Sequence, residues 1–166
     1  MKHLAFSFLL LTLLISCSSV DKNTAKNITL IENYVTAVEN MDIKVMGSFL
    51  AENYKGLGPS FGDSIGKEQA LVNWKYNVDN LYEKIEYRKS RNVAVNITTG
   101  DNQGQWVSNW AVLDIQYKNG AGTVTIWANT NYQIENEKIV KSYTCYNEAD
   151  ALRQLGYVLI NQVQEF

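Results

Sequence analysis

Apolar residues recur at helical spacing in three segments of the N-terminal half. Residues 28–39 place four of them on one face of a helix: Ile31, Tyr34, Val35 and Val38. A second helix is expected after Asp42, whose carboxylate can cap its N-terminus. The third segment, residues 67–82, carries Leu71, Trp74, Val78 and Leu81 at spacings of three and four. Between the last two, residues 56–63 are rich in Gly and include the only proline, so they predict a loop.

The period of the pattern changes to two after residue 84, which predicts strands at 85–89, 93–97, 106–117, 122–133 and 138–146. Asn147 can cap a last helix that ends at Gly156. Helices followed by a run of strands are typical of an α+β domain, here a curved antiparallel sheet packed on the N-terminal helices. We place this domain at residues 27–156, followed by a C-terminal tail at 157–166.

The longest hairpin can be assigned a register because Asn119-Gly120 is a strong turn signal. The turn pairs Tyr117 with Gly122 and, further along, Asn109 with Thr130. One face of the hairpin is then apolar except at Asn109 and Thr130, which could also hydrogen-bond to each other. The opposite face is polar but carries three tryptophans, namely Trp106, Trp110 and Trp127. Such a face predicts a homodimer interface or an interaction scaffold, unless residues 157–160 or the strands at 85–97 cover it.

The first residues form a lipoprotein signal: Lys2, a short apolar run from Leu4 to Leu14, and a small residue directly before Cys17. The run is too short for an ordinary membrane span, which needs roughly 20 apolar residues, although a short anchor is the alternative interpretation. We expect residues 1–16 to be removed and Cys17 to be lipidated. Residues 17–26 would be a polar tether. The expected location is the bacterial cell envelope, at the outer membrane facing the periplasm.

Composition excludes several classes of site. The only histidine, His3, belongs to the signal, so the mature chain lacks the commonest general base and metal ligand. We expect no metal and no cofactor. The net charge of −2 becomes one unit more negative when Lys2 is removed, and no basic block exists, so nucleic acid is not an expected partner. Cys145 lies in an apolar strand pattern and is interpreted as a buried packing residue rather than a nucleophile.

The segment 138–156, KIVKSYTCYNEADALRQLG, resembles the C-terminal signature of SnoaL-like proteins. These proteins belong to the nuclear-transport-factor-2-like (NTF2-like) superfamily, which also contains ketosteroid isomerases. The resemblance implies a cone-shaped sheet around a long helix with a pocket between them. It also implies that the family's catalytic Asp and His positions are occupied here by Thr144 and Thr130. Neither threonine titrates near neutral pH, so the cyclase mechanism does not carry over.

If Thr144 and Thr130 face the pocket, other residues on the same faces of their strands also face it. The N-terminal helices contribute the rest of the pocket wall. The expected pocket set is Tyr34, Trp74, Asn109, Thr130, Tyr132, Ser142, Thr144 and Tyr146. An apolar, aromatic wall with a few hydroxyls and one amide suits a small, largely apolar ligand. The alternative is that these side chains simply fill the core.

Three functions remain open. The first is a lipid-anchored domain that binds a small molecule without catalysis. The second is an isomerase- or cyclase-type enzyme acting on an enolisable ketone, with Asp63 as base and Tyr34 as hydrogen-bond donor, although Asp63 also fits an exposed turn residue. The third is a protein-interaction scaffold that uses the tryptophan face.

Overall fold

The computed structural model describes residues 22–158 and residue 160. Residues 1–21 are outside this range, so the predicted signal and Cys17 lie outside the described residues. Within it, α2 (Lys22–Glu39) begins inside the predicted tether, because residues 22–26 continue the helix toward the N-terminus. Asn27 anchors this part of the helix to the sheet, since its side-chain amide donates to Gln105 Oε1 at 2.6 Å. No helix among the described residues is long and apolar enough to cross a membrane.

The other helices begin close to where the sequence predicts them. Asp42 caps α3 (Ile43–Phe49), because its carboxylate accepts the Val45 N–H at 2.9 Å. The third segment forms α4 (Lys67–Asn80). Asn147 caps α5 (Glu148–Gln154) by accepting the Asp150 N–H, and Gly156 follows it with φ +85°. All four apolar residues predicted for the buried face of α2 lie in the core.

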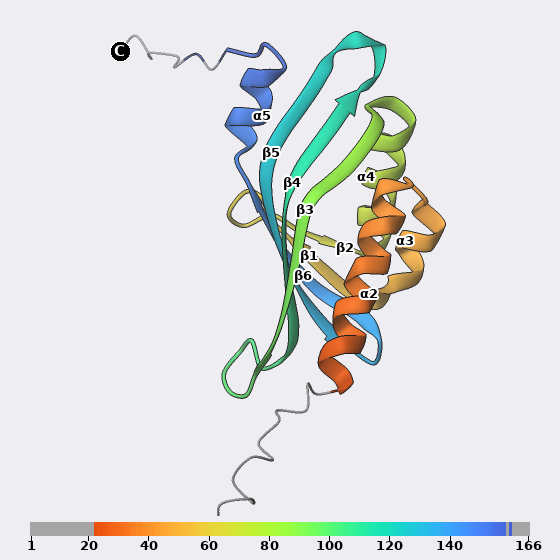
Figure 1. Cartoon of the computed structure of the whole chain (residues 1–166), viewed down its shortest axis with the longest axis vertical. Helices are drawn as coiled ribbons and strands as arrows, with labels where there is room; N and C mark the ends of the chain where they lie inside the picture. The colour runs from red at the N-terminus through yellow and green to blue at the C-terminus, as the bar shows by residue number, and fades with distance from the viewer. Residues whose placement is uncertain (1–21, 159, 161–166) are drawn as a thin grey trace, which may run out of the picture.

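In the described part of the chain, six strands form one sheet in the order β2-β1-β6-β5-β4-β3. Their bounds are β1 Leu50–Leu57, β2 Ser64–Gly66, β3 Tyr82–Ile97, β4 Gly104–Tyr117, β5 Gly122–Glu135 and β6 Lys138–Tyr146. All neighbouring strands are antiparallel except β1 and β6, which are parallel. Helices α2, α3 and α4 lie on one side of the curved sheet (Figure 1). The predicted α+β fold class is therefore confirmed.

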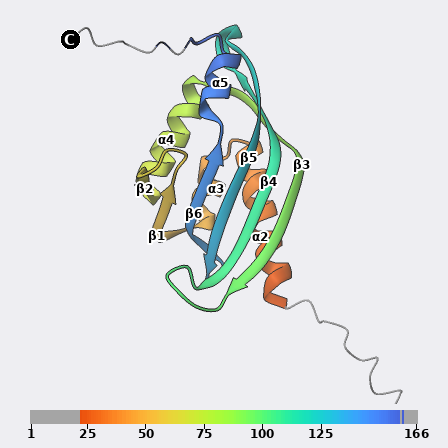
Figure 2. The same cartoon turned by 90° about the vertical axis from the view of Figure 1, so that its left-hand side faces the viewer.

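The β4–β5 hairpin has the register that the Asn119-Gly120 turn predicts. Tyr117 pairs with Gly122, Leu113 with Ile126, and Asn109 with Thr130. The long strands β3, β4 and β5 run side by side over most of the domain (Figure 2). The two segments predicted at 85–89 and 93–97 are one strand, β3, which is interrupted by a bulge between Arg88 and Arg91.

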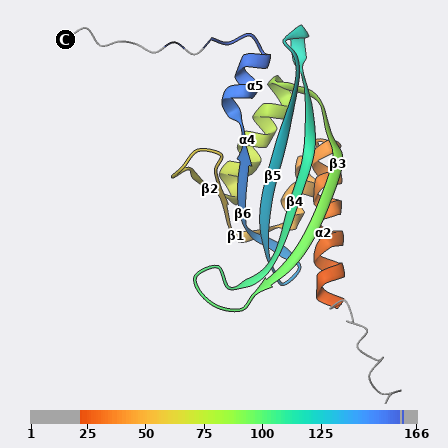
Figure 3. The same cartoon turned by 60° about the vertical axis from the view of Figure 1, so that its left-hand side comes forward.

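The sheet edge formed by β1 and β2 is not predicted by the sequence pattern. β1 has no strict alternation of apolar and polar residues, and β2 has only three residues. This edge curves toward α4, which contacts both strands, while β6 separates it from the long hairpin (Figure 3). The edge therefore closes one side of the space between helices and sheet.

The tryptophan face differs from the prediction at one position. Trp106 is only 5% exposed, because its ring stacks on Tyr143 with centroids 5.9 Å apart. Its indole N–H also donates to the Asn102 carbonyl at 2.8 Å. Trp110 and Trp127 are 43% and 73% exposed, and Tyr157, Val158 and Ile160 are exposed rather than packed on them. Whether this face binds a second copy stays a prediction.

Cys145 is also placed differently, since it is exposed rather than buried. It lies opposite Asn129 on the outer face of the sheet, one residue beyond the cavity-facing Thr144. β6 carries aromatic or apolar residues on its outward face as well, such as Tyr143. For this reason the apolar pattern around Cys145 does not indicate which face of the sheet it occupies.

Gly58 allows the loop after β1 to approach β6 closely. It has φ +89°, and a Cβ there would lie 2.3 Å from the Thr144 carbonyl oxygen. Gly62 in the same loop has φ +92° but open space around it.

We therefore expect Gly58→Ala to lower the free energy of unfolding by about 2 to 4 kcal/mol, because it combines backbone strain with a clash. The matched variant Gly62→Ala carries the backbone strain alone and is expected to cost about 1 kcal/mol. Urea unfolding followed by tryptophan fluorescence measures both. Equal losses in the two variants would contradict the close approach of Gly58 to β6.

Candidate functional site

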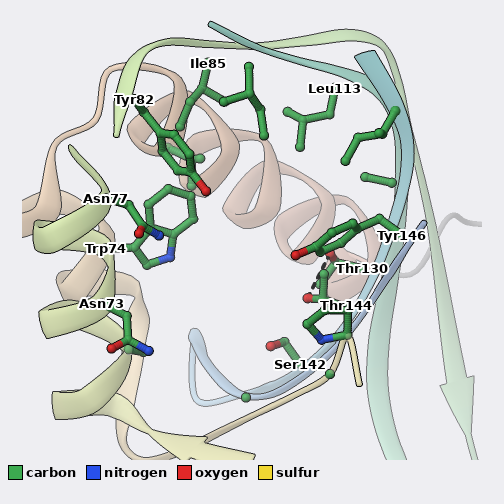
Figure 4. A pocket seen from close by; sticks show the side chains of 18 of the residues that line it. Asn73, Trp74, Asn77, Tyr82, Ile85, Leu113, Thr130, Ser142, Thr144 and Tyr146 are labelled. Carbon is green, nitrogen blue, oxygen red and sulfur yellow. Dashed lines mark hydrogen bonds between the residues drawn. The ribbon is translucent and has the colours of Figure 1, made fainter. Parts of the chain in front are cut away.

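A cavity of about 500 Å³ lies between the concave face of the sheet and the helices. Its apolar wall comes from inward residues of β3, β4 and β5, such as Ile85, Leu113 and Ile126. Helix α4 forms the opposite wall with Trp74 and two amides, Asn73 and Asn77 (Figure 4). Helix α2 packs directly on β3 and β4, whereas α4 has fewer contacts with the long strands, so space remains between α4 and the sheet.

Seven of the eight predicted pocket residues line this cavity. They are Tyr34, Trp74, Thr130, Tyr132, Ser142, Thr144 and Tyr146. The five on strands follow from strand parity, because β5 and β6 pair Thr130 with Thr144 and Tyr132 with Ser142. Tyr34 and Trp74 follow from the helical spacing of α2 and α4. Whether they contact a ligand stays a prediction.

Asn109 is the exception and does not line the cavity. It is 2% exposed, and its side-chain amide donates to Ser90 Oγ at 2.8 Å and Asn92 Oδ1 at 2.9 Å. Both partners lie beside the bulge of β3. The bulge interrupts the regular pairing of the strands, so polar groups of β3 need hydrogen-bond partners, and the Asn109 side chain of β4 provides one. The predicted hydrogen bond between Asn109 and Thr130 is therefore wrong. Asn109 has a structural role at the bulge.

Two side-chain hydrogen bonds organise the polar part of the cavity wall. The hydroxyls of Tyr54 and Ser142 lie 2.7 Å apart, and those of Thr130 and Thr144 lie 3.2 Å apart. Thr130 also hydrogen-bonds to the Tyr132 hydroxyl. A hydroxyl has one donor and two acceptor sites, so each pair keeps acceptor capacity toward the cavity.

Among the described residues, seven tyrosines line the cavity, and the sequence pattern predicts three of them. It does not predict Tyr54, Tyr82, Tyr87 and Tyr117. The last three could have been found by extending the hairpin register, because Tyr87 lies opposite Leu113 and Tyr82 opposite Tyr117. Tyr54 cannot be predicted in this way, because it lies in β1, a strand that the sequence pattern does not indicate.

The tyrosine hydroxyls inside the cavity stay neutral at physiological pH. Burial raises the pKa of Tyr34 and of Tyr132 well above the ordinary value of 10. Burial, helped by the nearby Glu39 carboxylate, raises the pKa of Tyr87 to about 12. These phenols can donate hydrogen bonds but cannot serve as bases near neutral pH.

The carboxylate proposed as a base is not in the cavity. Asp63 is exposed in the loop after β1, where its backbone accepts from Gly58 and donates to Ser60, and it is not among the lining residues. Glu148, at the start of α5, is the only acidic residue among those that line the cavity.

Helix α5 covers part of the cavity, and the side chain of Gln154 joins it to the sheet by hydrogen bonds. The Gln154 amide donates to the Thr125 carbonyl at 2.9 Å and accepts the Thr125 N–H at 2.8 Å. This amide takes the place of a neighbouring strand, because β6 ends opposite Ala128 and leaves this part of β5 unpaired on that side. Leu152 and Leu155 then face the cavity.

No family model and no curated protein matches the sequence. Solved structures do match the fold. A putative polyketide cyclase from Xanthomonas campestris pv. campestris aligns with a TM-score of 0.66 at 18% identity, covering 81% of this chain and 99% of that chain. The chain has the SnoaL/NTF2-like fold.

Two further structures show the variety of proteins that share this fold. An LEH-like epoxide hydrolase from M. tuberculosis aligns with a TM-score of 0.60 at 15% identity, covering 80% of this chain and 91% of that chain. A ketosteroid isomerase-like protein from Catenulispora acidiphila, solved in complex with trimethylamine, aligns with a TM-score of 0.60 at 17% identity, covering 78% and 93%. At these identities the likeness establishes the NTF2-like fold and leaves the activity open.

The raised pKa of the buried tyrosines predicts a loss of stability in alkali. An unfolded tyrosine ionises near pH 10, whereas folded Tyr87 keeps its proton until about pH 12. Between these values the unfolded chain binds fewer protons, so the free energy of unfolding falls as the pH rises; below pH 10 the contribution is fully present. The urea midpoint should therefore decrease from pH 10 to pH 12.

The variant Tyr87→Phe provides the control, because it removes one of the groups responsible. Its midpoint should fall less steeply over the same pH range. A slope equal to that of the original protein would contradict the burial of the Tyr87 hydroxyl.

Proposed function

We propose that this NTF2-like domain binds a small, largely apolar molecule in its cavity without catalysing a reaction. The observation that carries the proposal is the cavity itself. About 500 Å³ stays open among the residues that the sequence places on the inner faces, and this volume is within the usual range for ligand sites. If these residues only filled a core, their side chains would pack against one another and leave no cavity of this size.

The chemistry of the wall supports binding over catalysis. By the resemblance to SnoaL-like proteins, Thr144 and Thr130 stand where that family has its catalytic Asp and His, and the two hydroxyls hydrogen-bond to each other here. The tyrosine phenols stay protonated, and the carboxylate of Asp63 lies outside the cavity. The Catenulispora protein of the same fold was solved with a small molecule, trimethylamine, which agrees with a binding role.

A cavity-filling variant tests this proposal. Ala128 lines the cavity on β5, so Ala128→Trp should fill it and weaken binding of N-phenyl-1-naphthylamine, a neutral apolar dye, by about tenfold or more. Fluorescence titration measures the affinity. The control is Thr123→Trp, which adds the same side chain on the exposed face of the same strand.

Native mass spectrometry of protein purified from its own cell envelope complements the titration. A co-purified small molecule that is absent from Ala128→Trp is the expected result. Equal dye binding by the two tryptophan variants, or no binding by the original protein, would refute the proposal.

The envelope location belongs to the same proposal and rests on the sequence alone. We expect Cys17 to carry lipid, so an alkyne-tagged fatty acid fed to cells should label the protein and the protein should fractionate with membranes. Cys17→Ser should abolish both. Cys145→Ser, which changes the other cysteine of the chain, should leave both unchanged. Labelling that survives Cys17→Ser would contradict the lipoprotein assignment.

An isomerase- or cyclase-type enzyme is the second candidate. It is favoured by the similar structures described as a cyclase and an epoxide hydrolase, and by the Tyr34 hydroxyl, which lines the cavity as a neutral donor. Its base would have to be Glu148 rather than Asp63, since only Glu148 reaches the lining. Turnover of an enolisable ketone that is lost in both Tyr34→Phe and Glu148→Gln would establish this candidate over simple binding.

A scaffold role for the outer sheet face is the third candidate. The exposed rings of Trp110 and Trp127 favour it, and they lie on the face of the sheet opposite the cavity. This role is compatible with ligand binding because the two surfaces share no residue.

A further inference from the structure

The formal charge on the cavity wall is negative only. Among the described residues that line the cavity there is no lysine, arginine or histidine, and Glu148 carries the only formal charge. An anionic ligand would therefore meet a carboxylate and no counter-charge, whereas a cation would meet its complement.

Glu148 is not neutralised by the chain itself. Among the described residues it forms no salt bridge. Arg153, the basic residue of α5, pairs with Asp150, and Lys118 donates to the carbonyls of Val78 and Asp79 at 2.7 and 2.9 Å. Glu148 is itself exposed, so its carboxylate is available to a ligand.

Four aromatic side chains face the same part of the cavity from four different elements. Trp74 of α4 meets Tyr82 of β3 edge to face with centroids 6.3 Å apart, and Tyr82 meets Tyr117 of β4 in the same way at 5.4 Å. Figure 4 shows Trp74 and Tyr82 on one wall and Tyr146 of β6 on the other, with the hydroxyls of Tyr82 and Tyr146 pointing into the space between. Tyr146 is also close enough to Glu148 to feel its charge.

This arrangement suits one class of cation. Aromatic faces and phenol oxygens attract positive charge, and indole and phenol rings do so most strongly when water is excluded. A quaternary ammonium group has no N–H donor and a tertiary one has a single N–H donor, so either is weakly hydrated and loses little on entering such a site. A primary ammonium group would need acceptors for three N–H donors.

We propose that the ligand is an amphiphilic organic cation whose tertiary or quaternary ammonium group lies among Trp74, Tyr82, Tyr117 and Tyr146, next to Glu148. Its apolar body extends along the inner faces of β3, β4 and β5, past Ile85, Leu113 and Ile126. This inference rests on the proposed function, because it names the class of ligand that the same cavity binds.

Displacement of the neutral dye by a pair of matched probes tests the inference. Phenyltrimethylammonium and tert-butylbenzene have nearly the same shape and differ in charge. The cation should displace N-phenyl-1-naphthylamine at a concentration about tenfold lower than its neutral isostere. Benzenesulfonate, an anion of similar size, should displace it least.

Two variants identify the groups responsible. Glu148→Gln should reduce the preference for the cation by about threefold or more, because the carboxylate is lost while the shape is kept. Glu137→Gln removes a carboxylate from the exposed turn before β6 and should leave the preference unchanged. Raising the salt concentration should weaken displacement by phenyltrimethylammonium but not by tert-butylbenzene, and this measurement needs no variant.

The outcomes separate this inference from the proposed function. Dye binding with equal displacement by the cation and its isostere would overturn the cation preference and leave the ligand-binding proposal standing. Absence of dye binding would overturn both. A preference for the cation that survives Glu148→Gln undiminished and does not respond to salt would also overturn the site as described.

Discussion

The register of the β4–β5 hairpin is the constraint on which the rest of the structure depends. Because side chains alternate between the two faces of a strand, a shift by one residue would exchange the apolar set with the tryptophans. The observed pairing of Leu113 with Ile126 directs the apolar set toward the helices. The pairing of Thr130 with Thr144 determines which residues of β6 face the helices. The pairing of Tyr87 with Leu113 does the same for β3. One turn therefore determines which residues enclose the cavity.

The cavity persists because large, rigid side chains support its walls. The ring of Tyr34 contacts Tyr132 edge to face with centroids 5.7 Å apart and contacts Phe49 in the same way at 6.1 Å. The first contact holds α2 against β5, and the second joins α2 to α3. Trp74, Tyr82 and Tyr117 form a second chain of edge-to-face contacts, between α4 and the sheet. Both aromatic supports contribute rings to the cavity wall.

Most of the fold could be predicted from local patterns, and the exceptions have physical causes. The helices and the long hairpin carry strong periodic and capping signals, as Asp42 and Asn147 illustrate. β1 and β2 carry none, because their pairing depends on β6 and on the close approach of Gly58. Five pocket residues followed from strand parity and two from helical spacing, but Asn109 did not, since the bulge in β3 creates local polar groups that no periodicity reveals. Trp106 shows a second limit, because whether an outward residue is covered depends on loops and neighbouring strands. Cys145 does follow alternation with Thr144, but the apolar residues around it in β6 favour a buried position instead.

The attachment of α5 has a consequence for exchange between the cavity and solvent. None of its residues is fully buried, and the paired hydrogen bonds of Gln154 to Thr125 are its polar connection to the sheet. Leu152 and Leu155 are its apolar contribution to the cavity wall. Loss of these few contacts would release the helix while the aromatic supports and every strand pair stay intact. Opening of this kind costs only a local fraction of the global stability. The rim of the cavity can therefore open while the sheet and helices α2 and α4 keep their packing.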